Sequence, residues 1–277
     1  MTTTPRAPTP RTVIEAFLPV RGDAPLDLIY NIANAAGIDD QPLRLAIRRM
    51  ISAGEITQAG RGRRGVLSLT AAGRDRLHQD RLGLRLALAQ DFGQAPWDGM
   101  WRLLAVSVPE ADRALRDALR RTLLDVGAAP VSTGLYVSPH DLTAVLATTS
   151  HDSLVRATAT HLDVRGVTDP HTIAEVLWPA SPIVDGYALV ASAVTEAGTL
   201  PGPAVESVLV QQLRLAEALE RAMRHDPLVP LELRSDPWPP SPLRRAWYET
   251  WNALSGRLPE EILYRDWLTI DPGSPGP

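Results

Sequence analysis

Two arginine-rich segments near the N-terminus contain the residue types that bind nucleic acid. The first is the segment 41–53, in which helical spacing places Gln41, Arg44 and Arg48 opposite an apolar face and Arg49 on its flank. In the major groove of DNA, arginine donates two hydrogen bonds to guanine and glutamine reads adenine. These four residues are therefore candidate DNA-binding residues, and a solvated helix face is the alternative.

The second segment, GRGRRG at 60–65, places Arg61, Arg63 and Arg64 between glycines. Glycine permits a close approach of the backbone to a duplex, and arginine binds phosphate or enters a narrow minor groove. A solvated charged turn is the alternative. The glycine spacing also matches the dinucleotide-binding pattern, but that pattern needs a helix after it, and the β-rich run 66–69 follows here.

Other kinds of chemistry find little support in the sequence. The chain has no cysteine, and its six histidines form no pair at helical spacing, so we expect neither a metal site nor a cofactor. Nucleophile elbows and phosphate-binding Walker loops are also absent, so we do not expect an enzyme. Asp98 is the one acid considered for an alternative nuclease, a reaction that requires clustered carboxylates around a metal.

The elements around the arginines predict a winged helix-turn-helix in residues 11–92. Helical patterns at 11–19, 25–37 and 39–54 are followed by two short β-rich runs on either side of the glycine-arginine tip. A long amphipathic helix over 71–90 comes next. Three helices followed by a hairpin is the element order of a winged helix, with the third helix as the recognition helix.

The residues that follow predict two further domains, which makes the fold class α+β multidomain. Residues 93–167 have the order β-α-β-β-α-β, with a short helix over 140–150, and this order is typical of a ferredoxin-like sandwich. Residues 168–271 are mostly helical, including segments near 242–255 and 258–268. We expect residues 1–10 to be a disordered leader and 272–277 a disordered tail.

The tryptophans of the helical region have two interpretations. They could line an apolar pocket for a ring or acyl ligand. The commoner role is to anchor helices in a core or in a dimer interface, and we favour it. These tryptophans are Trp178, Trp238, Trp247, Trp251 and Trp267.

Composition and charge restrict the partners of the chain. Its 277 residues are 44% hydrophobic, with no long apolar run and no signal peptide, so we expect a cytoplasmic protein that does not enter a membrane. Residues 1–90 hold 13 arginines against 8 acids, and residues 91–277 hold 15 against 24. A basic front joined to an acidic remainder predicts that only the front meets a polyanion.

Four stretches of the chain resemble the PaaX-like family of transcriptional regulators, the phenylacetic acid catabolic repressor family. They are LRLAIRRM at 43–50, GRGRRGVLSLTAAG at 60–73, the pair WDGMWRLLAVSVPE and STGLYVSP within 97–139, and DPLVP with DPWPPSPLRRAWYETW within 226–251. The pair within 97–139 is the most specific of these matches.

This resemblance implies a homodimer that binds a palindromic operator as a repressor and is released by an aromatic acyl-CoA thioester. The candidate effector-binding residues are Trp97, Arg113, Arg116 and Arg120, the arginines being suited to phosphate groups. The acidic balance after residue 90 and the presence of only two phenylalanines depart from what such an effector would need. Two alternatives stay open: a DNA-binding protein that ignores effectors, and a nuclease built on the ferredoxin-like domain.

Overall fold

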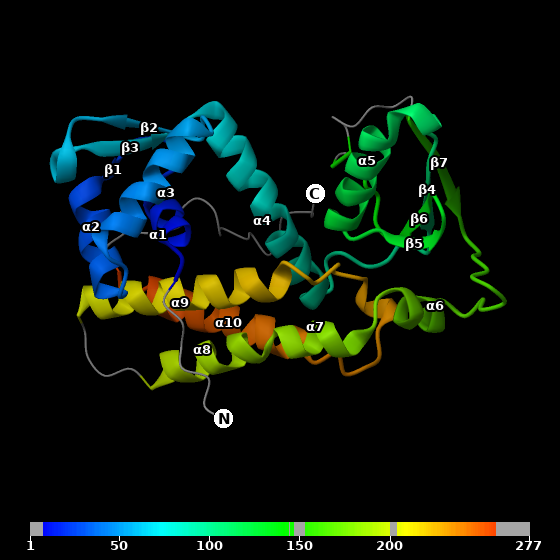
Figure 1. Cartoon of the computed structure of the whole chain (residues 1–277). Helices are drawn as coiled ribbons and strands as arrows, with labels where there is room; N and C mark the ends of the chain where they lie inside the picture. Colours follow the sequence, from blue (N-terminus) through cyan, green and yellow to red (C-terminus); the bar gives the residue numbers. More distant parts are fainter. Residues whose placement is uncertain (1–7, 144, 147–152, 200–203, 259–277) are drawn as a thin grey trace. The chain divides into compact units, whose positions relative to one another are not determined.

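The computed structural model describes residues 8–143, 145–146, 153–199 and 204–258, and it confirms the α+β class (Figure 1). The chain divides into two compact units. The first comprises the described parts of Met1–Leu88, Gly186–Arg224 and Pro240–Pro277, and the second those of Ala89–Asp185 and His225–Pro239. Each unit is therefore assembled from segments far apart in the sequence, whereas we expected three consecutive domains.

The front of the first unit contains three helices and a small antiparallel sheet. In chain order they are α1 (Pro10–Phe17), β1 (Ala24–Pro25), α2 (Leu26–Ala35), α3 (Asp40–Ser52), β2 (Ile56–Ala59) and β3 (Val66–Leu69). The sheet has the order β1-β3-β2, with Ile56 opposite Leu69 and Ala59 opposite Val66. The helices and the β2–β3 hairpin follow the predicted pattern, but β1 was not expected.

Helix α4 (Ala71–Asp91) starts where the hairpin ends. The hydroxyl of Thr70 accepts a hydrogen bond from the backbone N–H of Gly73 at 3.0 Å and thereby caps the helix. A Cβ on Gly73 would overlap the carbonyl oxygen of Glu55, so this position requires glycine. The Thr-x-x-Gly motif therefore fixes α4 directly against the start of the hairpin.

The first unit also contains three later helices, α8 (Ala188–Gly198), α9 (Val205–Met223) and α10 (Pro240–Ser255). Helix α9 packs against α8 and α10, and also against α1 and α2. Trp247 and Trp251 stack with ring centroids 5.1 Å apart, and the Trp247 indole donates to the carbonyl of Leu215 at 2.9 Å. These two tryptophans are core residues, whereas Trp267 lies outside the described residues.

The second unit is built on a four-stranded antiparallel sheet. Its elements are β4 (Trp101–Val106), η2 (Glu110–Asp112), α5 (Arg113–Asp125), β5 (Ala129–Ser132), β6 (Leu135–Ser138), β7 (Leu154–Ala159), α6 (Pro170–Leu177), most of α7 (Ala180–Gly186) and η4 (Leu231–Leu233). The strand order β5-β6-β4-β7 fits a ferredoxin-like sheet. The short helix expected over 140–150 lies partly outside the described residues.

The two faces of this sheet bury separate cores, because successive side chains of a strand alternate between faces. On one face Trp101 and Val137 pack with Ile173 of α6. On the other, Leu104 and its neighbours pack with Leu119 and Leu123 of α5. Trp178 belongs to the first core and Trp238 is also buried.

Among the described residues, no helix has the length and apolar character needed to cross a bilayer.

One buried carboxylate joins α1 to α9. Glu217 accepts hydrogen bonds from the backbone N–H of Thr9 at 3.1 Å, from the hydroxyl of Thr12 at 2.7 Å and from Arg221 at 2.7 Å. Burial raises the pKa of Glu217, but the hydrogen bonds from Thr12, Thr9 and Arg221 outweigh it, so the pKa is lowered. The ionised carboxylate therefore stabilises the folded state.

We expect Glu217→Ala to lower the free energy of unfolding by about 3 kcal/mol at neutral pH, because buried hydrogen-bond donors lose a charged acceptor. Because the pKa of Glu217 is lower in the folded state than in the unfolded state, the ionised carboxylate stabilises the fold at any pH above the unfolded pKa. This stabilisation is lost as the pH falls through the folded pKa. The difference in free energy of unfolding between wild type and variant, measured by urea unfolding, should therefore become smaller on acidification. Glu249→Ala, at an exposed position of α10, is the control and should change stability by less than about 0.5 kcal/mol. A gap independent of pH would contradict this role for the carboxylate.

Candidate nucleic-acid interface

The outer face of α3 presents the residues expected there from the sequence. Helix α3 buries Leu43, Ile47 and Met50 against the unit. The candidate DNA-binding residues of this helix are all exposed, and they are Gln41, Arg44, Arg48 and Arg49. Leu45 lies on the same outer face with 47% of its surface exposed, a residue that we did not select from the sequence. An exposed leucine beside arginines can contact the methyl group of thymine.

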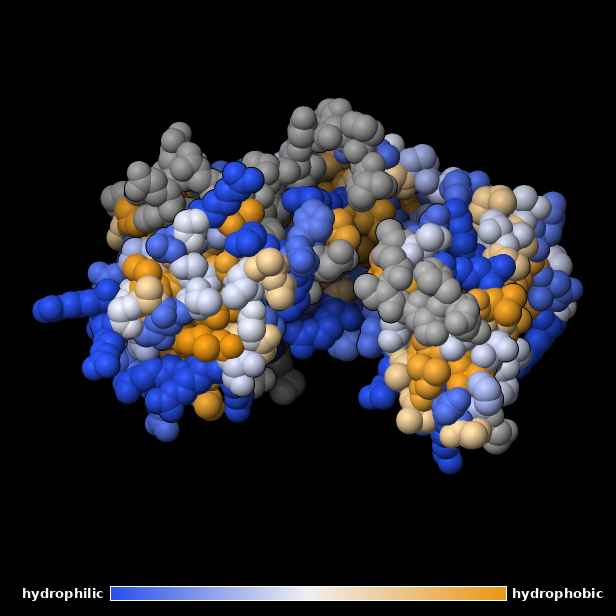
Figure 2. All heavy atoms as spheres, turned by 90° about the horizontal axis from the view of Figure 1, so that it is seen from above, coloured by the Kyte–Doolittle hydropathy of each residue, from blue (hydrophilic) through white to orange (hydrophobic). Residues whose placement is uncertain are grey.

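The glycine-arginine tip forms a short 3-10 turn, η1 (Gly62–Arg64), between β2 and β3. Arg61, Arg63 and Arg64 are exposed on it. Hydrophilic side chains, drawn in blue, project from this part of the molecule in the space-filling view (Figure 2). The unit therefore presents two sets of exposed arginines, one on α3 and one on the hairpin tip.

Arg63 differs from the other tip arginines because it turns back onto the helices. Its guanidinium donates to Asn31 Oδ1 at 3.0 Å and to Asp40 Oδ1 at 3.2 Å, and it lies 5.1 Å from the ring centroid of Tyr30. Asp40 also pairs with Arg44 at 3.4 Å. These contacts attach the hairpin tip to α2 and to the first turn of α3.

Asp40 is the centre of this attachment, which we call the Asp40 cluster (Asn31, Asn34, Asp40, Arg63). With its amide nitrogen facing α3, Asn34 donates to Asp40 at 3.2 Å, and its oxygen accepts from Arg63 at 3.3 Å. Desolvation raises the pKa of Asp40, but the hydrogen bond from Asn34 and the charge of Arg63 outweigh it and hold this pKa below its usual range. The carboxylate therefore stays charged and keeps Arg63 in place.

The remaining arginines of the two sets have no such attachment. Within the part of the chain that the structure describes, Arg48, Arg49, Arg61 and Arg64 have no ion-pair partner. Their charge is available to an external polyanion.

The structure does not bring the four candidate effector residues together. Trp97 packs edge-on against Trp101, with ring centroids 5.3 Å apart, at the core that includes α6. Arg113, Arg116 and Arg120 lie on α5, which covers the opposite face of the sheet. Arg113 is 4.0 Å from Asp117, and Arg116 donates to the carbonyl of Pro109 at 3.4 Å.

The Trp97-Asp98-Gly99 motif forms a turn that leads into β4. Asp98 accepts from the backbone N–H of Met100 at 3.0 Å and from Arg102 at 2.7 Å, and Gly99 has a φ of +76°. The hydrogen bond from Arg102 is the main reason that the pKa of Asp98 is lowered. Asp98, the one acid considered for a nuclease, is therefore engaged by Arg102. Among the described residues, no group of three or more potential ligands could hold a metal ion.

The Asp40 cluster gives a structural prediction for the hairpin tip. In Asp40→Ala, Arg63 loses its charged partner, so we expect faster backbone amide exchange at residues 60–65, measured by hydrogen–deuterium exchange. Asp39→Ala is the matched control, since the Asp39 side chain makes no capping hydrogen bond. Equal exchange in the two variants would show that Asp40 does not hold the tip.

Comparison with known proteins finds a matching family model and matching solved structures, while no curated protein matches the chain. The solved structure of an uncharacterized protein, Rv0674 from Mycobacterium tuberculosis, is 22% identical, covers 83% of this chain and 87% of its own, and superposes with a TM-score of 0.51, which shows a shared fold. The family model of the PaaX protein central Cas2-like domain matches residues 94–174, from the segment before β4 into α6. The chain therefore contains a central domain of the PaaX type, and its resemblance to the PaaX-like family is confirmed over these residues.

Proposed function

We propose that this protein is a DNA-binding transcriptional regulator in which α1–α3 and the β2–β3 hairpin act as a winged helix-turn-helix. The observation that carries the proposal is the pair of exposed arginine sets on α3 and on the hairpin tip, whose members Arg48, Arg49, Arg61 and Arg64 have no ion-pair partner among the described residues. A recognition helix followed by a basic wing is a recurrent way of holding a duplex.

The residues of the two arginine sets have different kinds of role in this proposal. Gln41 and Arg48 read base edges in the major groove, and Leu45 contacts a thymine methyl group. Arg61 and Arg64 neutralise phosphates, and Arg49 adds a flanking contact to the DNA. Arg63 positions the wing, because Asp40 already occupies part of its guanidinium.

The regulatory part of the proposal rests on the PaaX resemblance. It comprises a homodimer on a palindromic operator, repression, and release by an acyl-CoA thioester. The charge asymmetry, basic before residue 90 and acidic after it, supports DNA contact by the front of the chain. We propose a cytoplasmic regulator rather than an enzyme. The ion pair of Asp98 with Arg102 argues against the alternative nuclease, for which Asp98 was the one acid considered.

Salt-dependent DNA binding tests the assigned roles. Arg61→Ala and Arg64→Ala should each reduce the slope of log affinity against log salt by about 0.9, the value for one lost phosphate contact. Arg63→Ala should weaken binding with a smaller change in slope, because its main contact is with Asp40. Arg48→Ala should relax base preference by about 1–3 kcal/mol at one position.

The control for these variants is Arg245→Ala, at an exposed position of α10 outside both arginine sets. An unchanged slope in both Arg61→Ala and Arg64→Ala would remove the wing from the interface. If Arg63→Ala changes neither the slope nor the affinity, Arg63 has no role in DNA binding.

The effector is tested by a mobility shift on the protein's own upstream DNA, with and without a panel of acyl-CoA thioesters. Release by one thioester is the result we expect from a repressor of this type. Specific binding that no thioester releases would leave a DNA-binding protein that ignores this class of effector. Absence of specific binding at low salt would reject the regulator itself, and divalent-dependent cleavage abolished by Asp98→Ala would replace it with a nuclease.

A further inference from the structure

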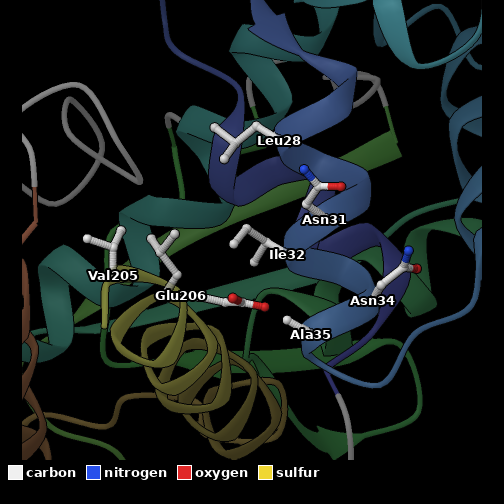
Figure 3. Close-up of a pocket in the computed structure, with 8 residues that line it drawn as sticks. Leu28, Asn31, Ile32, Asn34, Ala35, Val205 and Glu206 are labelled. Atoms are coloured by element: carbon white, nitrogen blue, oxygen red, sulfur yellow. The ribbon is translucent and has the colours of Figure 1, made fainter. Parts of the chain in front are cut away.

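A groove lies between α2 and α9 in the first unit, with a volume of about 570 Å³ (Figure 3). Most of its lining is apolar and comes from Leu28, Ile32 and Ala35 of α2 and from Val205 and Leu209 of α9. The remaining lining residues are Asn31, Asn34 and Glu206. The groove is open to solvent, and of its lining residues only Ile32 and Leu209 are buried.

Glu206 gives the groove its charge preference. Its carboxylate points toward Ala35 between the two helices (Figure 3). Within the described residues, no cation pairs with this carboxylate. An apolar groove with one unpaired carboxylate is complementary to a ligand that has an apolar body and a cationic, hydrogen-bond-donating head, and it repels an anionic head.

The rim of the groove also belongs to the Asp40 cluster, which holds the hairpin tip. Asn31 accepts from Arg63 at 3.0 Å, and Asn34 contacts both Asp40 and Arg63. Both asparagines line the groove as well. A ligand that hydrogen-bonds these amides competes with Arg63 and Asp40 for them, and this competition would loosen the attachment of the hairpin tip.

We propose that the α2–α9 groove binds an amphipathic amine and that its occupation weakens DNA binding by releasing the Asp40 cluster. The regulatory half of this inference rests on the proposed function. The binding half does not, because it concerns only the groove and its carboxylate. The ligand class differs from the polyanionic thioester that the PaaX resemblance implies, so the two effectors would act at separate sites.

Calorimetry on the full chain tests the binding half, with n-decylammonium and n-decanoate as probes of equal chain length and opposite charge. We expect n-decylammonium to bind more tightly than n-decanoate. Glu206→Gln should weaken the binding of n-decylammonium about two- to five-fold, the range for an exposed ion pair. The same variant should not weaken the binding of n-decanoate. Ala35→Phe fills the groove and should abolish binding, whereas Glu249→Gln on α10 is the charge-matched control and should change nothing.

Three results would overturn the site: no binding of n-decylammonium to the wild type, binding that survives Ala35→Phe, or equal affinity for the two probes. Circular dichroism of each variant identifies any that fails to fold. If Ala35→Phe is unfolded, Glu206→Gln decides between a carboxylate-directed site and none.

The coupling has one readout that requires no DNA. The Arg63 side-chain Nε–Hε resonance, assigned by its loss in Arg63→Lys, should shift when n-decylammonium is added, and Asn31→Ala should reduce that shift. If the Arg63 resonance does not shift although n-decylammonium is bound in the groove, the coupling between the groove and the Asp40 cluster is wrong.

A second readout uses the operator. The amine should weaken operator binding about five-fold or more, and the operator should weaken amine binding by the same factor, because linkage is reciprocal. If the chain binds no specific DNA, the proposed function fails, while the calorimetric and Arg63 measurements still decide this inference. If operator binding is specific but indifferent to the bound amine, the regulatory half is wrong and the site stands.

Discussion

The attachment of α1 to α9 through Glu217 is the interaction on which the first unit depends. A carboxylate that accepts from Thr9, Thr12 and Arg221 ties the start of the first helix to a helix more than two hundred residues later in the chain. Such a buried carboxylate is tolerated only because donors surround it, and removal of these donors would leave an uncompensated charge. The proposed DNA-binding helices are therefore held by a long-range contact as well as by their own small core.

A second cluster of charges reinforces this frame from another direction. Glu15 of α1 pairs with Arg11 at 2.6 Å and with Arg76 of α4, and Arg11 also reaches Glu55 at 2.5 Å. Burial raises the pKa of Glu15 despite the opposing charges of Arg76 and Arg11. These ion pairs join α1, the start of β2 and the first turns of α4, so some of the arginines near the N-terminus serve the fold and not an external partner.

Local patterns in the sequence predicted the individual helices and strands well. Apolar spacing and glycine or proline at the ends define α2, α3 and α5 because these signals act within one helix. Strand β1 was missed, since two residues carry no periodicity and pair only because β3 lies beside them. The assembly of α8–α10 with the front of the chain was missed for the same reason, because no local pattern encodes a contact between distant segments.

In the candidate interface too, local patterns predicted the individual residues but not the contacts between distant segments. Residue type and helical phase identified Gln41, Arg44, Arg48 and Arg49 as exposed positions on one helix. They could not show that Asp40 holds Arg63, because that contact needs the hairpin tip to fold back onto α2 and α3. For the same reason, Trp97 and the arginines of α5 were grouped from their types, although Trp97 packs beside Trp101 in the core on one face of the sheet and α5 covers the other face.

The division of the chain into discontinuous units has a consequence for modularity. The backbone passes from one unit to the other four times, near residues 88, 185, 224 and 239. A fragment ending after α4 would lack α9 and with it Glu217, so α1 and α2 would lose the surface on which they pack. The helices proposed to read DNA are thus not a portable module. Any event that changes α9, such as a ligand, a partner or a substitution, acts directly inside the folding unit to which those helices belong.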